Sequence, residues 1–314
     1  MFDLIEQFIE LDRDEDFAKF QKDVADSFYN GLVGCYKENG NELKMVDAMV
    51  GSLNGKKYKN IRLITNRIHG STSLVTFDYY GRKVTREAGD TVIIQAITRK
   101  WKIIFNKLCI IQNKRDRMDD GVWSIELEQL YFLKNFPKFT GQGIFSGMSE
   151  IVLTNRSGCL GAYGLFQSPG DMLLMSASLV EESRKGKAKL SIENISVPCA
   201  SCSHPSHFVD SEYYLREIAF GGRLSPWHII GENGFLGCKR FSRNIHDFVR
   251  DITHISIGEP VYAFGEVLNT FGYEVSLGLM REIGAGEYIN IDKKGNHKFG
   301  KSGVSVILLQ FEVE

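Results

Sequence analysis

Two apolar segments joined by a short basic reversal constrain the fold of this chain more than any other feature. Residues 91–97 form a nearly continuous apolar run, and residues 101–112 form a longer one, with Arg99 and Lys100 between them. A run of this kind is typical of a strand that is covered on both faces. The pair therefore predicts a buried antiparallel hairpin. Together with a third β-rich segment, residues 74–80, it predicts a three-stranded meander.

Helical and extended patterns alternate on both sides of this meander. Apolar residues recur at helical spacing within residues 2–31, and further helices are expected over residues 43–49, 125–136 and 244–252. Additional strands are expected over residues 61–65, 160–166, 172–177 and 304–313. This order is typical of an α/β fold in which helices flank a mixed sheet.

Three regions follow from these patterns. Residues 1–42 form an N-terminal helical segment, and residues 43–180 form the predicted core. A charged stretch at residues 181–189 marks the boundary to a C-terminal α+β region, residues 181–314, whose expected role is substrate recognition or another accessory function.

The composition is that of a soluble globular protein without a strong overall charge. The chain has 314 residues, 43% of them hydrophobic and 25% charged, and a formal net charge of −1. A polyanionic partner would therefore have to be held by a local basic patch. We expect no signal peptide and no membrane contact, because no stretch reaches the roughly 20 apolar residues of a membrane span. The six cysteines are scattered, which favours a reducing compartment, so we expect a cytoplasmic protein.

Four polar side chains are expected to meet at one edge of the predicted hairpin. Asp90 stands at the start of the first strand, directly after Gly89. Gln112 and Lys114 stand at the end of the second strand, and because they are two positions apart they point to the same side. The register of the hairpin places Asp90 opposite them, and Glu87 lies within the reach of one loop.

This set of side chains suits the hydrolysis of a phosphodiester. Mg²⁺ or Mn²⁺ prefers oxygen ligands, so Asp90 is a candidate direct ligand and the Gln112 amide oxygen a neutral one. Lys114 would orient the attacking water and stabilise charge that develops on the phosphate, while Glu87 is a supporting or alternate ligand. The alternative is that Gln112 and Lys114 only mark the place where a strand meets water.

The same residues resemble a known group of nucleases. Asp90, a strand, and a second strand ending in Gln112-Asn113-Lys114 resemble the PD-(D/E)xK superfamily, which has the restriction-endonuclease-like fold. Residues 87–90, EAGD, resemble its acidic lead-in, and the resemblance covers residues 43–177. Gln112 replaces the usual Asp or Glu, as in the QxK variant of Mrr-type restriction enzymes, which leaves the site one negative charge weaker.

The resemblance implies a particular core and a particular activity. The core would be a helix, a three-stranded meander, a helix and a strand. The activity would be that of a metal-dependent endonuclease acting on DNA, with a role in restriction or anti-phage defence. We expect a homodimer if both strands of a duplex are cut, because two active sites do this most simply.

Basic residues near the motif are candidate contacts for nucleic acid. Arg115 and Arg117 directly follow the second strand, and Arg67 and His69 lie just before the first strand of the meander. Such residues position a phosphate backbone without reading sequence. The alternative for each arginine is a solvated edge, and for His69 it is a turn cap, which we favour.

A cysteine- and histidine-rich stretch raises the alternative of a structural zinc ion. Cys199, Cys202, His204 and His207 have the side chains of zinc ligands, but they crowd into nine residues. Cys238, His228 or His246 would have to complete the site, and a loop without metal is favoured.

The alternative to a nuclease is a catalytically weakened module on the same fold that binds nucleic acid or a partner protein. A C-terminal half that binds zinc would be consistent with this alternative.

Overall fold

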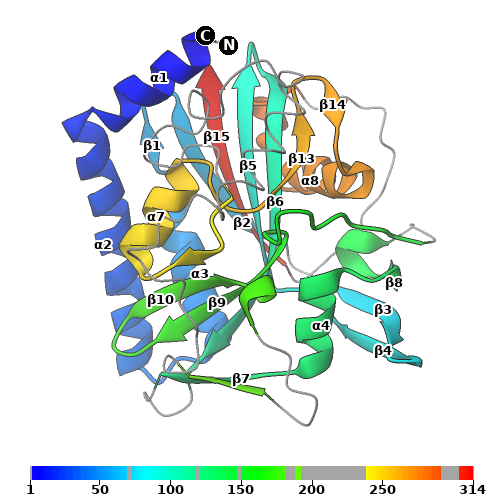
Figure 1. Cartoon of the computed structure of the whole chain (residues 1–314). Helices are drawn as coiled ribbons and strands as arrows, with labels where there is room; N and C mark the ends of the chain where they lie inside the picture. Colours follow the sequence, from blue (N-terminus) through cyan, green and yellow to red (C-terminus); the bar gives the residue numbers. More distant parts are fainter. Residues whose placement is uncertain are drawn as a thin grey trace.

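The computed structural model describes residues 2–68, 73–116, 121–146, 150–180, 188–191, 238–290 and 304–313. It has an α/β architecture in which helices cover both faces of a mixed sheet (Figure 1). This confirms the general class that the sequence predicts. The helices are α1 (Phe2–Asp12), α2 (Glu15–Lys37), α3 (Glu42–Leu53), α4 (Leu127–Asn135), α7 (Ile245–Thr253) and α8 (Thr270–Glu282). No helix in these ranges is long and apolar enough to cross a membrane.

The large sheet follows an order that does not match the order of its strands in the sequence. Its members, in spatial order, are β1 (Lys57–Tyr58), β2 (Ile61–Arg67), β15 (Ser305–Val313), β5 (Thr91–Arg99), β6 (Lys102–Arg115), β9 (Gly161–Gln167), β10 (Asp171–Ser176) and β12 (Phe241–Ser242). Beside β9, the strand β13 (Glu259–Ala263) also pairs with β6, and β14 (Glu266–Val267) pairs with β13.

The predicted hairpin is the centre of this sheet. β5 and β6 pair antiparallel from Thr91 opposite Ile111 to Arg99 opposite Lys102. Lys100 and Trp101 form the turn, with φ angles of 50° and 66°. Two consecutive residues with positive φ are the requirement of the tight turn whose twist matches that of the strands. The hairpin is therefore confirmed, with its turn one residue later than Arg99-Lys100.

The predicted three-stranded meander is wrong in its first strand. The segment at residues 74–80 forms β3 (Leu74–Tyr79), which pairs with β4 (Arg82–Glu87) and β8 (Phe139–Gly141) in a separate small sheet. The neighbour of β5 is instead β15, which pairs parallel with β5 and antiparallel with β2 (Figure 1, red). β3 buries only alternate residues, so the small sheet suits it better than the fully covered centre. A two-stranded sheet, β11 (Ala188–Ser191) with β7 (Val122–Ile125), completes the strands.

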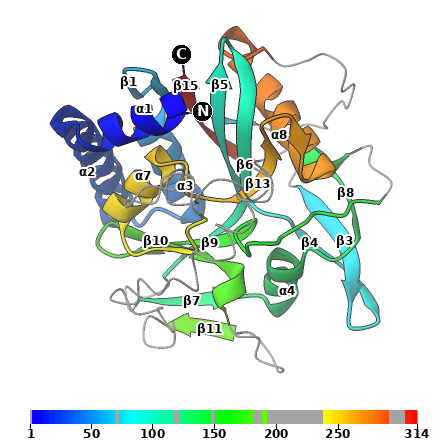
Figure 2. The same ribbon diagram turned by 45° about the horizontal axis from the view of Figure 1, so that its top comes forward.

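Two apolar cores lie on the two faces of the large sheet. Helices α1, α2, α3 and α7 contribute to one core, and α4 and α8 to the other (Figure 2). Along β6, Cys109 and Ile111 face the first core while Leu108 and Ile110 face the second. The strand is thus covered on both faces, which explains why its sequence is apolar without interruption.

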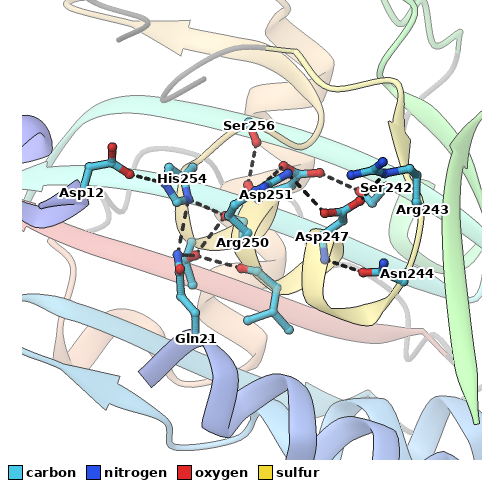
Figure 3. A network of polar contacts seen from close by, with 12 residues as sticks. Asp12, Gln21, Ser242, Arg243, Asn244, Asp247, Arg250, Asp251, His254 and Ser256 are labelled. Carbon is cyan, nitrogen blue, oxygen red and sulfur yellow. Dashed lines mark hydrogen bonds and ion pairs between the residues drawn. The ribbon is translucent and has the colours of Figure 1, made fainter. Parts of the chain in front are cut away.

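Polar contacts tie α7 to the N-terminal helices (Figure 3). The Nε2 atom of His254 lies 3.2 Å from Asp12 Oδ1, and Gln21 Nε2 donates to Thr253 Oγ1 at 2.7 Å. On the far side of the helix, Ser242 Oγ donates to Asp251 Oδ2 at 2.9 Å. The large sheet and the first core therefore contain elements from both sides of the boundary at residues 180 and 181.

Candidate functional site

Asp90 is held against the end of β6 at the point where the chain enters β5. Its backbone N–H donates to the Ile111 carbonyl oxygen at 3.0 Å. Gly89 permits this approach, because a Cβ atom there would lie 2.8 Å from Ile110 Cγ2 and 2.9 Å from the Ile111 carbonyl oxygen. Asp90 consequently lies opposite Gln112, the position expected from the hairpin register.

The Asp90 carboxylate is enclosed by hydrogen-bond donors from β6. Its Oδ2 accepts from Gln112 Nε2 at 2.9 Å, and its two oxygens accept from the Asn113 backbone N–H at 3.1 and 3.2 Å. The Asn113 side-chain amide donates to Asp90 Oδ1 as well, and to Thr91 Oγ1 at 2.8 Å. Burial, followed by the nearby Glu42 carboxylate, raises the pKa of Asp90 to about 8 despite these donors. A cation bound here at neutral pH would therefore displace a proton.

Gln112 connects Asp90 to α4. Its Oε1 accepts from Gln129 Nε2 at 2.6 Å, and the same Gln129 nitrogen donates to the Glu87 carbonyl oxygen at 3.1 Å. Both glutamine side chains are buried. The amide oxygen that would bind a metal is thus engaged within the protein. Metal binding by Gln112 stays a prediction, and the ion would share this oxygen with the Gln129 amide or replace it.

Lys114 lies among carboxylates at the rim of the sheet. Its Nζ is 4.0 Å from Glu42 Oε1, and its side chain keeps 21% of its surface exposed. Burial raises the pKa of both Glu42 and Glu87, and the Lys114 ammonium opposes this increase in each of them. We call Glu42, Glu87, Asp90, Gln112 and Lys114 the carboxylate site. The site has three acidic side chains and one lysine, whose charge acts on Glu42 and Glu87, so acidic groups outnumber basic ones.

Glu42 is the member of this site that the sequence did not indicate. Asn41 caps α3, with its Oδ1 accepting from the Lys44 backbone N–H at 3.1 Å, so Glu42 falls in the first helical turn. Glu42 Oε2 accepts from the Arg115 backbone N–H at 3.3 Å, which draws the helix start to the end of β6. An asparagine followed by an acid signals a helix start, but it does not reveal which strand the helix start contacts.

Of the basic residues predicted to contact nucleic acid, the two that the structure describes, Arg67 and Arg115, contact separate partners within the protein. The Arg115 guanidinium donates to the Gly40 carbonyl oxygen and lies 4.9 Å from the centre of the Tyr36 ring, so it joins the end of β6 to α2 and to the turn that follows α2. Arg67, at the end of β2, donates to Asp47 Oδ1 at 2.8 Å. His69 and Arg117 lie outside the described residues, and all four nucleic-acid contacts stay predictions.

The predicted zinc ligands Cys199, Cys202, His204 and His207 also lie outside the described residues. Of the residues expected to complete that site, Cys238 lies beside Lys107, and His246 lies 3.9 Å from Asp26. These two side chains have separate partners on different elements.

The donor chemistry of the carboxylate site fits Mg²⁺ or Mn²⁺, but its geometry is not that of an assembled ligand group. Carboxylate and amide oxygens are the donors that these ions prefer, and the excess negative charge favours a cation. Within the described ranges, no three His, Cys, Asp or Glu side chains are grouped so that they could hold a metal ion. For a metal ion to bind, Asp90 would have to give up a hydrogen bond from Gln112 or Asn113. The side chains of Glu42 and Glu87 would also have to move toward Asp90.

Comparisons with known proteins do not assign the chain to a family. No family model, no curated protein and no solved structure matches it. The geometry of the carboxylate site and the resemblance of its motif are the two observations that bear on function.

Proposed function

We propose that this protein is a metal-dependent endonuclease that hydrolyses phosphodiester bonds, with DNA as its substrate. The observation that carries the proposal is the position of Lys114, which is partly buried 4.0 Å from Glu42 and close to Glu87, at the end of the strand whose Gln112 and Asn113 hold the Asp90 carboxylate. Carboxylates beside a lysine at the end of a central hairpin are the groups required to bind a divalent cation and to stabilise a phosphate in reaction.

The arrangement of the surrounding elements supports the resemblance to the PD-(D/E)xK superfamily. A helix, α3, precedes β2, and the β5–β6 hairpin is followed by α4 and by β9, which pairs parallel with β6. The match is incomplete, because β15 separates β2 from β5. We propose a restriction-endonuclease-like core with an inserted strand. A homodimer, a role in restriction or anti-phage defence, and a cytoplasmic location are further parts of this proposal.

The side chains of the site would divide the chemistry between them. Asp90 and Glu42 would hold Mg²⁺ or Mn²⁺, and Glu87 would supply a further carboxylate. The metal would supply a Lewis acid that lowers the pKa of water and neutralises phosphate charge. Lys114 would donate to a nonbridging phosphate oxygen and orient the attacking water. Gln112 and Asn113 would keep the Asp90 carboxylate aimed at the end of the sheet.

The test is the cleavage of plasmid and phage DNA, modified and unmodified, with Mg²⁺ or Mn²⁺. We expect the wild type to cut and Lys114→Ala to lose at least about 100-fold in rate while it still binds DNA. Lys102→Ala is the matched control, because Lys102 is an exposed lysine at the opposite end of the same strand. Equal cutting by wild type and Lys114→Ala would contradict the proposal.

One observation favours a second candidate, a module that binds nucleic acid or a protein without cutting. Both Asp90 oxygens and the Gln112 amide oxygen already accept hydrogen bonds from within the protein. A hydrogen-bond network of this kind also serves as a structural unit. If the wild type binds DNA with the same affinity with and without metal and cuts nothing, this second candidate replaces the first.

A further inference from the structure

The partner of β6 changes along its length, and this leaves a fork in the sheet. β13 pairs with β6 from Phe105 to Leu108, and β9 pairs with it from Ile110 onward. At the fork the Lys239 backbone N–H donates to the Ser256 carbonyl oxygen at 2.7 Å. Gly258, with a φ of 92°, lies against β6, where a Cβ atom would be 2.6 Å from the Leu108 carbonyl oxygen. Three chain segments therefore converge on one side of β6.

Four reactive side chains meet at this fork, and we call Lys107, Cys159, Cys238 and Glu259 the thiol cluster. Lys107 Nζ donates to Cys238 Sγ at 3.7 Å. The Cys159 thiol is hydrogen-bonded to the Cys238 sulfur, and Cys159 Sγ lies 3.6 Å from the Lys239 carbonyl oxygen. Glu259 accepts from the Ser157 backbone N–H at 3.1 Å and from the Ser157 hydroxyl. The two thiols are thus neighbours, with a cation on one side and a carboxylate on the other.

The burial of Lys107 indicates which charge state the cluster favours. Its side chain is fully buried, a position in which lysine is found only when it is paired. The Cys159 hydrogen bond and the Lys107 ammonium lower the pKa of the Cys238 thiol against the opposing effect of burial. The pKa of Cys159 is raised, first by its hydrogen bond to Cys238 and then by burial. Burial, followed by the Cys238 sulfur, raises the pKa of Glu259 to about 7. These surroundings therefore favour ionisation of Cys238 over ionisation of Cys159.

We propose that Cys159 and Cys238 form a peroxide-sensitive dithiol site, in which Cys238 is the attacking sulfur and Cys159 the resolving sulfur. Cys238 is partly exposed, whereas Cys159 is buried, so a peroxide meets Cys238 first. The site lies in the middle of β6, on the strand whose end carries Lys114, and it does not depend on the proposed nuclease activity.

The chemistry of the site balances with hydrogen peroxide as the oxidant. The Cys238 thiolate attacks one peroxide oxygen, so that an S–O bond forms, the O–O bond breaks, and hydroxide leaves and is protonated to water. The Cys159 thiol then loses its proton and attacks the sulfenic sulfur. An S–S bond forms, the S–O bond breaks, and a second water leaves. Two thiols and one peroxide thus give one disulfide and two waters.

The main experiment treats the reduced full chain with a small excess of hydrogen peroxide and maps the disulfides by mass spectrometry. We expect a Cys159–Cys238 linked peptide as the main product. It should be absent from Cys159→Ser and Cys238→Ser and unchanged in Cys35→Ser, which removes a partly exposed thiol on α2. In Cys159→Ser, Cys238 should proceed to sulfinic and sulfonic acid because its resolving partner is missing.

The role of Lys107 is tested by the rate at which iodoacetamide labels Cys238. In wild type this rate should reach half of its maximum at a lower pH than the labelling of Cys35. Lys107→Met should slow the labelling of Cys238 at pH 7 by at least about tenfold, since an ordinary thiol is only a few per cent ionised there. If Lys107→Met does not fold, the wild-type pH profile decides. An ordinary profile for Cys238, or a disulfide from Cys238 to Cys199 or Cys202 instead of Cys159, would overturn the proposal.

Discussion

Lys107 and Lys114 lie on the same strand, seven positions apart, yet the protein treats their charges in opposite ways. Lys107 is fully buried and donates to the Cys238 sulfur. Lys114 keeps part of its surface in water and stands 4.0 Å from Glu42. The middle of β6 thus encloses its cation within the protein, whereas the end of β6 presents its cation to the rim.

The difference shows what each lysine is free to do. A buried ammonium without water must keep its partners, because a separated buried charge is costly. A partly exposed ammonium can exchange one anionic partner for another at lower cost, since ion pairs near the surface contribute about 0–1 kcal/mol. Lys107 is therefore held to its partners within the protein, whereas Lys114 can exchange its partner at the rim of the sheet.

The same substitution at the two lysines should separate these roles most clearly. We expect Lys107→Ala to lower the free energy of unfolding by about 2–5 kcal/mol, because it leaves a cavity in a packed sheet. Lys114→Ala should change it by at most about 1 kcal/mol. Urea unfolding at pH 7 under reducing conditions measures both. If Lys107→Ala and Lys114→Ala lose the same free energy of unfolding, the surroundings of the two lysines differ less than their burial indicates.

A second test uses the raised pKa of Asp90. Asp90 retains its proton up to about pH 8 when folded, whereas it ionises near its ordinary value of 3.8 when unfolded. The folded state therefore binds one more proton between these values, and stability falls as pH rises through this window. Asp90→Asn lacks this ionisable group, so its free energy of unfolding should not show this loss. As pH rises from 5 to 7, the stability of the variant relative to wild type should increase by about 3 kcal/mol. If the difference in the free energy of unfolding between wild type and Asp90→Asn does not change with pH, the folded state does not bind the extra proton.

The smallest expected effect concerns the glycine that makes room for Asn113. A Cβ atom at Gly164 would collide with Asn113 Oδ1, and the Asn113 amide cannot turn away without losing its bonds to Asp90 and Thr91. We expect Gly164→Ala to cost about 1–3 kcal/mol by forcing this shift. Gly34→Ala is the control, because Gly34 lies within α2 with open space around it, and it should gain about 0.5–1 kcal/mol. Thermal unfolding of the two variants compares them directly.

Local patterns were enough to predict the centre of the fold. The β5–β6 hairpin and the opposition of Asp90 and Gln112 follow from two apolar runs and a tight reversal, which involve neighbouring residues only. The small sheet was not predicted, because β4 reads RKVTRE and this charged sequence suits an exposed strand. α8 was missed because Gly272 and Gly278 weaken its helical pattern, although both are buried in the structure.

Contacts between distant segments could not be predicted from local patterns. Glu42 reaches the carboxylate site because α3 starts at the end of β6, and Cys238 reaches Lys107 because β13 and β9 diverge. Both are consequences of tertiary packing, and the sequence near either residue carries no trace of its partner. The apolar run at β15 was recognised as a strand, but its place between β2 and β5 depends on pairing across more than half of the chain.

The position of β15 also sets an order of events during synthesis. It is the last strand described, yet it supplies both the antiparallel partner of β2 and the parallel partner of β5. Until residues 305–313 are synthesised, the edges of β2 and β5 that β15 covers in the folded protein lack this partner. Such edges are liable to pair with other chains, and contacts this distant in sequence form slowly. The nascent protein would thus depend most on chaperones just before residues 305–313 emerge, and a chain cut short before them would be prone to aggregation.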